Sequence, residues 1–227
     1  MLVPDAEPRA VLFDMDGTLL DSEKVWDVSL ADLAAHLGGS LSRGTREAMM
    51  GSNMRVSVGL LITDLGLRGD VALLDEAGRW LTSRTAELFA GELPWRPGAD
   101  ALIDAVRAAG WRTALVTNTG RFLTDAALRT LRADRFEVTV CGDEVEHGKP
   151  APDPYLRAAA MLEVAPQDCL AVEDSPTGAA SASAAGCPVL VIPCEVAVAP
   201  APGQVQRRTA VDLAAGELAE VWRSLRT

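Results

Sequence analysis

The sequence predicts an α/β protein whose core is a Rossmann-like, doubly wound parallel sheet, with an all-helical domain inserted into that core. Two observations lead to this fold class. Short apolar runs typical of buried strands alternate with helical segments over the second half of the chain. Between the first strand and the second, a long stretch shows only the helical period. We therefore expect core segments at 1–21 and 94–227 and a helical domain at 22–93.

The first predicted strand is the apolar run from Ala10 to Phe13. A continuous run of this length is typical of a strand buried on both faces of a sheet. It ends abruptly in the acidic turn Asp14-Met15-Asp16-Gly17-Thr18. The strand is therefore expected to carry two carboxylates at its carboxyl end.

The region 22–93 is predicted to form roughly four helices joined by short turns. Its apolar residues recur at helical spacing, as Leu30, Leu33 and Leu37 do. Glycine-containing turns divide the region at Gly38-Gly39, Gly51-Ser52-Asn53, Gly66, Gly69-Asp70 and Gly91. Little in it indicates strands, so a small helical bundle is the expected structure.

The remainder of the chain is predicted to alternate between helices and strands. The expected elements are a helix over 99–109, a strand over 113–116, a helix ending at 131, a strand over 137–140, a helix over 154–162, a strand over 169–172, an alanine-rich helix ending near 186, a strand over 189–192 and a helix after 212. Helical crossovers of this length join parallel strands. The Ala/Pro-rich stretch 196–202 is expected to be a surface loop.

The charge of the chain limits its partners. Lysine and arginine total 21 and aspartate and glutamate 32, which gives a formal net charge of −11. The field of such a chain repels nucleic-acid backbones and anionic membranes, so neither is an expected partner. It also opposes a phosphorylated substrate. Any phosphate site must therefore rely on nearby cations and backbone N–H groups.

The cysteines and the chain ends indicate a cytoplasmic protein. The four cysteines form no C-x-x-C pair and have no histidines at zinc spacing, so free thiols in a reducing compartment are expected. The segment Met1 to Asp5 lacks the basic and apolar pattern of a secretion signal. The most apolar segment, 188–202, is interrupted by prolines and Glu195, so no membrane span is expected. A monomer is the simplest assumption.

Polar residues follow four of the predicted strands. They are Asp14 and Asp16 after the first, Thr117, Asn118 and Thr119 after the second, Lys149 in the loop after the third, and Glu173, Asp174 and Ser175 after the fourth. Because the carboxyl ends of parallel strands share one edge of a sheet, these side chains are expected to converge. Carboxylates suit Mg²⁺, and a lysine with donors at helix N-termini suits phosphate. The cluster is therefore predicted to bind magnesium and a phosphate group.

These residues resemble the four ordered motifs of the haloacid dehalogenase superfamily. The motifs read Asp14-Met15-Asp16-Gly17-Thr18-Leu19, Thr117, Lys149-Pro150 and Glu173-Asp174. The helical region between the first two is similar in placement to the cap of the phosphatase and β-phosphoglucomutase branch. The resemblance implies a Mg²⁺-dependent phosphatase that hydrolyses a small phosphorylated metabolite, such as a sugar phosphate, through an aspartyl-phosphate intermediate.

The resemblance also implies a role for each catalytic residue. Asp14 is the nucleophile that attacks phosphorus, and Asp16 protonates the leaving oxygen and then activates water. Thr117 holds a phosphoryl oxygen through its hydroxyl. Lys149 offsets the negative charge of Asp14 and of the transferring group.

The implied metal site is formed by acidic residues. Mg²⁺ would be held by the side chains of Asp14 and Asp174 and by the backbone carbonyl of Asp16, with Glu173 beside the metal as an indirect partner. Two further residues are expected to bind substrate. Asn118 would contribute at the phosphate, and Arg55 would contact a phosphate or carboxylate of the substrate from the helical cap.

Each of these residues alone also has a purely structural explanation. Asp-x-Asp-Gly is an ordinary acidic turn, Thr117 suits a helix N-cap, and Lys149 suits a solvated loop. An arginine on a helix surface, such as Arg55, is commonly solvent-exposed. The four motifs taken together and in order favour catalysis.

Three other functions are compatible with this scaffold. A dehalogenase needs neither the acid at Asp16 nor a metal at Asp174, so both residues oppose it. A sugar phosphomutase of the β-phosphoglucomutase type is the main alternative. In such mutases a histidine lies shortly after the first motif, where this chain has Trp26, otherwise expected as a packing anchor. That difference favours hydrolysis. A non-catalytic phosphometabolite-binding protein is disfavoured because every motif keeps a chemically competent residue.

Overall fold

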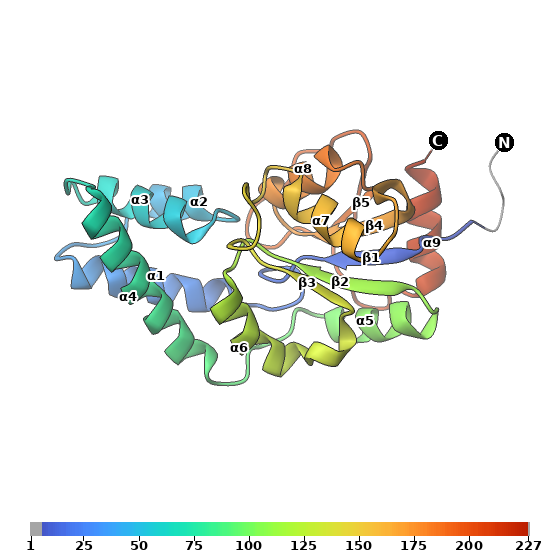
Figure 1. Ribbon diagram of the computed structural model, residues 1–227, viewed down its shortest axis with the longest axis horizontal. Coiled ribbons are helices and arrows are strands. Elements are labelled where there is room, and N and C mark those ends of the chain that lie inside the picture. The colour runs from blue at the N-terminus through green and yellow to red at the C-terminus, as the bar shows by residue number, and fades with distance from the viewer. Residues whose placement is uncertain (1–5, 227) are drawn as a thin grey trace.

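The computed structural model describes residues 6–226, so the prediction for Met1 to Asp5 lies outside the described residues. The chain forms a sheet covered by helices and, at one end, a separate group of four helices (Figure 1). The beginning of the described chain and the C-terminal helix lie at the far end of the sheet part from those four helices (Figure 1). The predicted fold class, a Rossmann-like parallel sheet with an inserted helical unit, is confirmed.

The core sheet has six strands, all paired in parallel, in the order β3-β2-β1-β4-β5-β6. The strands are β1 Ala10–Phe13, β2 Arg112–Val116, β3 Val138–Val140, β4 Cys169–Glu173, β5 Val189–Val191 and β6 Gln204–Gln206. Strand β1 lies between β2 and β4, and Phe13 is level with Leu115 on one side and Val172 on the other. The residues that follow these three strands therefore meet at one edge of the sheet.

Helices cover both faces of the sheet. They are α5 Ala99–Ala108, α6 Arg121–Leu131, α7 Asp153–Met161, α8 Pro176–Ala184 and α9 Ala215–Ser224, with short 3₁₀ turns at Ala133–Arg135 and Pro166–Asp168. Val11 and Phe13 pack with α5, α6 and α9, whereas Ala10 and Leu12 pack with α7 and α8. Side chains alternate along a strand, so covering both faces requires every residue of β1 to be apolar. This explains its continuous apolar run.

The four remaining helices pack around an apolar cluster of their own. They are α1 Glu23–His36, α2 Arg43–Met49, α3 Met54–Asp64 and α4 Val71–Phe89. Leu33, Leu61 and Leu81 are fully buried at the centre of this cluster. Asn53 and Asp70 begin α3 and α4 as N-caps, each accepting a hydrogen bond from a backbone N–H one turn along. We propose that residues 22–93 form the cap domain.

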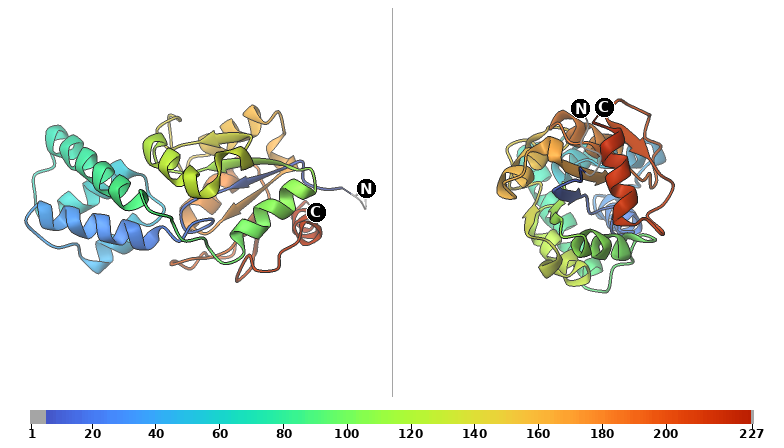
Figure 2. Two further views of the ribbon diagram at one scale, coloured as in Figure 1. Left: turned by 90° about the horizontal axis from the view of Figure 1, so that it is seen from below. Right: turned by 90° about the vertical axis from the view of Figure 1, so that its right-hand side faces the viewer.

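The two chain segments that join the cap to the core lie side by side (Figure 2). The backbone N–H of Asp21 donates to the carbonyl of Pro94 at 2.8 Å, and that of Arg96 donates to the carbonyl of Leu19 at 2.8 Å. The entry to α1 and the exit from α4 are therefore fixed to each other at the carboxyl end of β1.

Strand β6 was not among the predicted strands. It has only three residues at the edge of the sheet, and its two glutamines are partly or fully exposed. A short, exposed edge strand has no apolar run or alternation by which it could be recognised.

In the described part of the chain, we find no helix with the length and apolar character needed to cross a bilayer.

We expect Leu12→Ala to lower the free energy of unfolding by about 2 to 5 kcal/mol, because it opens a cavity beneath a central strand. Leu12 is 0% exposed. Urea denaturation followed by circular dichroism measures the change. Phe122→Ala is the control, since Phe122 is 65% exposed and its loss should cost about 0.5 kcal/mol or less. Equal costs for the two variants would contradict this account of the core.

Candidate active site

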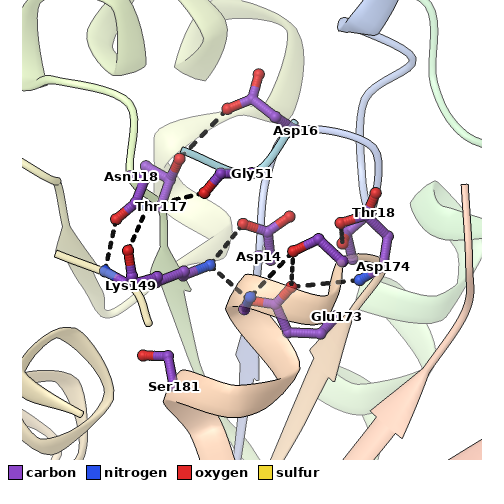
Figure 3. A network of polar contacts seen from close by, with 12 residues as sticks. Asp14, Asp16, Thr18, Gly51, Thr117, Asn118, Lys149, Glu173, Asp174 and Ser181 are labelled. Atoms are coloured by element: carbon purple, nitrogen blue, oxygen red, sulfur yellow. Dashed lines mark hydrogen bonds and ion pairs between the residues drawn. The ribbon is translucent and has the colours of Figure 1, made fainter. Parts of the chain in front are cut away.

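Asp14, Lys149, Glu173 and Asp174 meet at the carboxyl edge of the sheet (Figure 3). Asp14 follows β1, Glu173 ends β4, and Asp174 comes directly after it. Lys149 reaches the same place from the loop between β3 and α7. All four side chains are buried. The convergence expected from the strand ends is therefore present for these four residues.

Lys149 bridges two carboxylates inside this cluster. Its Nζ lies 2.7 Å from Oδ1 of Asp14 and 2.6 Å from Oε1 of Glu173. Tyr155, from α7, donates its hydroxyl to the same Glu173 oxygen at 2.6 Å. The ammonium group is fixed from two sides, so its charge is held beside Asp14 without depending on solvent.

Burial and neighbouring charges shift the pKa values of Asp14, Lys149 and Asp174. Burial raises the pKa of Asp14 to about 7, although the charge of Lys149 opposes that rise. Burial also raises the pKa of Asp174 well above its ordinary value. For Lys149, burial alone would lower the pKa, but the charges of Asp14 and Glu173 outweigh it, and the pKa is raised. Three buried carboxylates thus lie beside one buried ammonium, and burial disfavours the charged forms of Asp14 and Asp174.

The carboxylates fit a divalent cation. One oxygen from each of Asp14, Glu173 and Asp174 lies within 4.8 Å of the others. Oδ2 of Asp14 is buried without a hydrogen-bond partner, and an unpaired buried carboxylate oxygen is costly unless something binds it. A hard cation that prefers oxygen ligands would offset part of the negative charge of these three carboxylates. The residues present therefore suit such an ion.

Glu173 is the least available of the three carboxylates for direct ligation. Its Oε1 accepts from Lys149 and Tyr155, while Oε2 accepts from the backbone N–H of Asp174 at 3.3 Å and from Ser175 Oγ at 3.4 Å. Gly178 in α8 leaves room for it, since a Cβ there would lie 2.0 Å from the carboxylate. Glu173 thus positions Lys149 and Asp174.

Gly17 makes room for Asp174 on the other side of the site. Its φ is +81°, and a Cβ at this position would lie 2.2 Å from Oδ2 of Asp174. Both the backbone conformation and the close approach require glycine. The Asp-x-Asp-Gly turn therefore determines the position of the facing carboxylate as well as its own.

Asp16 is held by four side-chain donors. Ser22 Oγ and Trp26 Nε1 reach Oδ1 at 2.6 and 3.1 Å, and Thr119 Oγ1 and Thr117 Oγ1 reach Oδ2 at 2.7 and 3.3 Å. Ser22 and Trp26 lie at the start of the cap, whereas the threonines follow β2. The carboxylate of Asp16 consequently links the cap hinge to the core. Trp26 is a hydrogen-bond donor here as well as a packing residue.

The side chain of Asn118 is hydrogen-bonded to backbone groups of Gly51 and Lys149. Its Nδ2 donates to the carbonyls of Gly51 and Lys149 at 3.0 and 3.1 Å, and its Oδ1 accepts from the backbone N–H of Lys149 at 2.8 Å. Gly51 lies between α2 and α3, so this amide joins the cap to the loop that carries Lys149 (Figure 3). Asn118 thus lies beside the site with its amide groups already engaged.

Arg55 is not part of the cluster. Its side chain is 68% exposed and lies 3.5 Å from Asp75 on the surface of the cap. The pocket between cap and core is lined instead by Asp14, Asp16 and Lys149 on the core side and by Glu23, Arg46 and several apolar residues on the cap side.

Sequence reasoning missed several of the contacts around the cluster. Tyr155, Ser22, Glu23 and Arg46 were not expected there. Thr119 was expected, because it follows the same strand as Thr117. The others lie inside helices or at a helix start, and their sequence neighbourhoods resemble ordinary amphipathic helices.

Comparison with known proteins agrees with this geometry. Residues 8–186 match the family of haloacid dehalogenase-like hydrolases. The chain belongs to this family. Protein CbbY of Rhodobacter capsulatus is 36% identical over 197 residues, which cover 83% of this chain and 87% of that protein. Hexitol phosphatase A of Escherichia coli strain K12 is 29% identical over 225 residues, which cover 94% and 93%.

Solved structures of haloacid dehalogenase-like proteins share the fold. A mutant CbbY from Rhodobacter sphaeroides in complex with xylulose-(1,5)bisphosphate has a TM-score of 0.78 at 28% identity, covering 91% of this chain and 96% of that one. β-Phosphoglucomutase from Clostridium difficile has a TM-score of 0.82 at 17% identity, covering 96% and 98%. Further relatives bear phosphatase names. The predicted family and enzyme class, a haloacid dehalogenase-like phosphatase, are confirmed.

Proposed function

We propose that this haloacid dehalogenase-like hydrolase is a Mg²⁺-dependent phosphatase that acts on a small phosphorylated metabolite, such as a sugar phosphate, through an aspartyl-phosphate intermediate on Asp14. The observation that carries the proposal is the buried, unpartnered Oδ2 of Asp14, a residue that lines the pocket and whose other carboxylate oxygen is held by Lys149. Hydrolysis of para-nitrophenyl phosphate with Mg²⁺, and its loss with EDTA, tests it.

Asp14 performs the first step in this proposal. Its free oxygen forms a bond to phosphorus while the ester P–O bond breaks, which leaves an acyl phosphate on the enzyme. Lys149 holds the other oxygen of Asp14 at 2.7 Å, and this orients the carboxylate for the attack. The same ammonium offsets charge on the phosphoryl oxygens. Thr117 would bind one of those oxygens, with Asn118 contributing next to it.

Asp16 moves the protons. The leaving oxygen takes a proton from Asp16 as the ester bond breaks, and Asp16 then takes a proton from the water that attacks the acyl phosphate. Phosphate leaves and Asp14 is restored. Ser22 and Trp26, which donate to Asp16, connect its position to the start of the cap. Closure of the cap over a substrate would therefore affect the position of Asp16, the residue that transfers the protons.

The side chains of Asp14 and Asp174 and the backbone carbonyl of Asp16 would hold Mg²⁺, with Glu173 positioning the site from outside the ligand set. The ion would supply positive charge to the phosphoryl oxygens during transfer. The net charge of −11 makes this local positive charge necessary.

Hydrolysis is favoured over the phosphomutase alternative by Trp26. Its indole Nε1 donates to Asp16 at 3.1 Å, where the sugar phosphomutases considered above have a histidine. An indole N–H can donate a hydrogen bond, but near neutral pH it cannot accept or give up a proton as a histidine can. A test for isomerisation of a sugar phosphate, run beside phosphate release, separates the two reactions. The functional groups in each motif weigh against a non-catalytic binding protein.

The proposed setting is the cytoplasm, with no nucleic-acid or membrane partner and a monomeric chain. All four cysteines are free thiols, as a reducing compartment requires. Gel filtration tests the monomer.

We expect Mg²⁺ to stabilise the protein more at pH 7.5 than at pH 5.5. The raised pKa values of Asp14, about 7, and of Asp174 mean that protons compete with the metal at the lower pH. A Mg²⁺ concentration of about 100 times Kd should raise Tm by roughly 5 to 10 °C at pH 7.5. Scanning fluorimetry at constant ionic strength measures both shifts. An Asp174→Asn variant that shifts as much as the wild type would contradict the proposed ligand.

We expect Asp14→Asn to lower kcat for para-nitrophenyl phosphate by about 10⁴-fold or more, because the nucleophile is removed. The fold should persist, since an amide of the same shape still accepts from Lys149. Steady-state kinetics and circular dichroism check both points. Asp125→Asn, in which the replaced side chain is 60% exposed, is the matched control and should keep wild-type activity. Full activity of Asp14→Asn would exclude the nucleophile assignment.

We expect Asp16→Ala to lower kcat by about 10² to 10⁴-fold with an alkyl phosphate, whose leaving oxygen needs a proton. The loss should be smaller with para-nitrophenyl phosphate, because its leaving group departs as an anion. The ratio of the two losses is the decisive measurement. Equal losses, or a negligible loss with the alkyl phosphate, would count against Asp16 as the acid.

A further inference from the structure

The cap wall of the pocket contains a partly buried ion pair that the proposed mechanism does not use. Glu23, in the first turn of α1, and Arg46, in α2, both line the pocket and are each 13% exposed. Arg46 Nη2 lies 2.6 Å from Oε2 of Glu23, and Arg46 Nε lies 2.5 Å from Oδ1 of Asp27. The arginine is therefore committed to two carboxylates of α1 and holds Glu23 in one position.

One oxygen of Glu23 is left available. Within residues 6–226, Oε1 has no hydrogen-bond partner, whereas Oε2 is bound by Arg46. A carboxylate oxygen in a pocket wall accepts hydrogen bonds, and its negative charge repels other anions. The orientation of Glu23 is set by the protein and does not have to be fixed by a ligand.

The charges of the pocket favour one kind of leaving group. Among the described residues that line it, the bases are Arg46 and Lys149, and both are ion-paired. Five carboxylates line the same space. Lys149 and a divalent ion can offset the phosphate that is transferred, but no lining cation is unpaired for a second anionic group. Arg55, the other candidate cation of the cap, is outside the pocket.

We infer that Glu23, held in place by Arg46, is a specificity-determining residue that accepts hydrogen bonds from hydroxyl groups of the substrate. The preferred substrate is then the monophosphate of a neutral sugar or polyol. Bisphosphates and phosphorylated carboxylic acids are disfavoured. This inference rests on the proposed phosphatase function and specifies the substrate class of the same site.

The physical basis is a difference between two contacts at one atom. A substrate hydroxyl donates a hydrogen bond to Oε1, and this bond replaces the one to water that Glu23 loses when the pocket fills. A second phosphate or a carboxylate brings only acceptors and a like charge to the same place, so Glu23 is left unpaired and repelled. Apolar neighbours on the cap wall, such as Met49 and Leu81, limit the access of water that would screen this repulsion.

The first experiment compares substrates on the wild-type enzyme. We would measure kcat/KM with Mg²⁺ for sorbitol 6-phosphate, glucose 6-phosphate, fructose 1,6-bisphosphate and 2-phosphoglycolate. The two neutral monophosphates should exceed the two anionic compounds by about tenfold or more. A bisphosphate or phosphoglycolate that is hydrolysed as well or better, or a failure to hydrolyse either neutral monophosphate, overturns the inference.

The second experiment uses Glu23→Gln, which keeps the shape and removes the charge. The ratio of kcat/KM for sorbitol 6-phosphate to that for fructose 1,6-bisphosphate should fall by about tenfold. Glu47→Gln is the matched control, since Glu47 forms an exposed pair with Arg43 on the same cap and should leave the ratio unchanged. If Glu23→Gln also leaves the ratio unchanged, Glu23 does not set specificity.

Two further measurements separate this inference from the proposed function. If para-nitrophenyl phosphate is hydrolysed with Mg²⁺ but the substrate ranking is reversed, the function stands and the inference fails. Calorimetric binding of the same four compounds to Asp14→Asn gives the ranking without turnover, so it decides the inference even if hydrolysis is absent. Arg55→Met should leave that ranking unchanged. If a bisphosphate binds best and loses this affinity in Arg55→Met, then Arg55 binds the second anionic group and our inference is excluded.

Discussion

The buried bridge from Lys149 to Asp14 and Glu173 is the interaction on which the site depends. A chain with a net charge of −11 that buries Asp14, Glu173 and Asp174 together requires positive charge at the same place. Lys149 supplies it at 2.7 and 2.6 Å. Removing the lysine would leave two uncompensated carboxylates in the interior. Three buried carboxylates share this one ammonium, which is why the same residues suit a divalent cation.

The parts of the site that the sequence predicts well are those determined by sheet topology. Asp14 and Asp174 directly follow adjacent parallel strands, so their proximity follows once β1 and β4 are recognised as apolar runs. Lys149 is less constrained, since it lies in the loop between β3 and α7, and its placement was expected both from its position after a strand and from the resemblance to a family. The four donors to Asp16 were not predictable, because two of them come from the cap, and the angle at which α1 leaves the core is not encoded in any local pattern.

Asn118 shows why residue type alone predicts position better than role. An asparagine after a strand end was expected at the phosphate, and it does lie at the edge of the site. Its amide, however, holds both the N–H and the carbonyl of Lys149 and also the carbonyl of Gly51 in the cap. One side chain therefore couples the seating of the cap to the loop that positions the lysine. Such a contact requires three segments far apart in sequence, so only the folded structure reveals it.

In the proposed function, catalysis and specificity depend on different parts of this molecule. The proposed catalytic residues that follow β1, β2 and β4 are placed by the hydrogen-bonded register of these strands, which fixes their backbone positions. Glu23 and Arg46 lie on the separate cap helices α1 and α2, and their alignment depends on the apolar cluster of the cap, in which Leu33 of α1 and Met49 of α2 are buried. A substitution in the cap can therefore change which leaving group fits without moving Asp14 or Lys149. This separation accounts for how one catalytic core can serve different phosphate esters, with the charge of the cap wall as the variable.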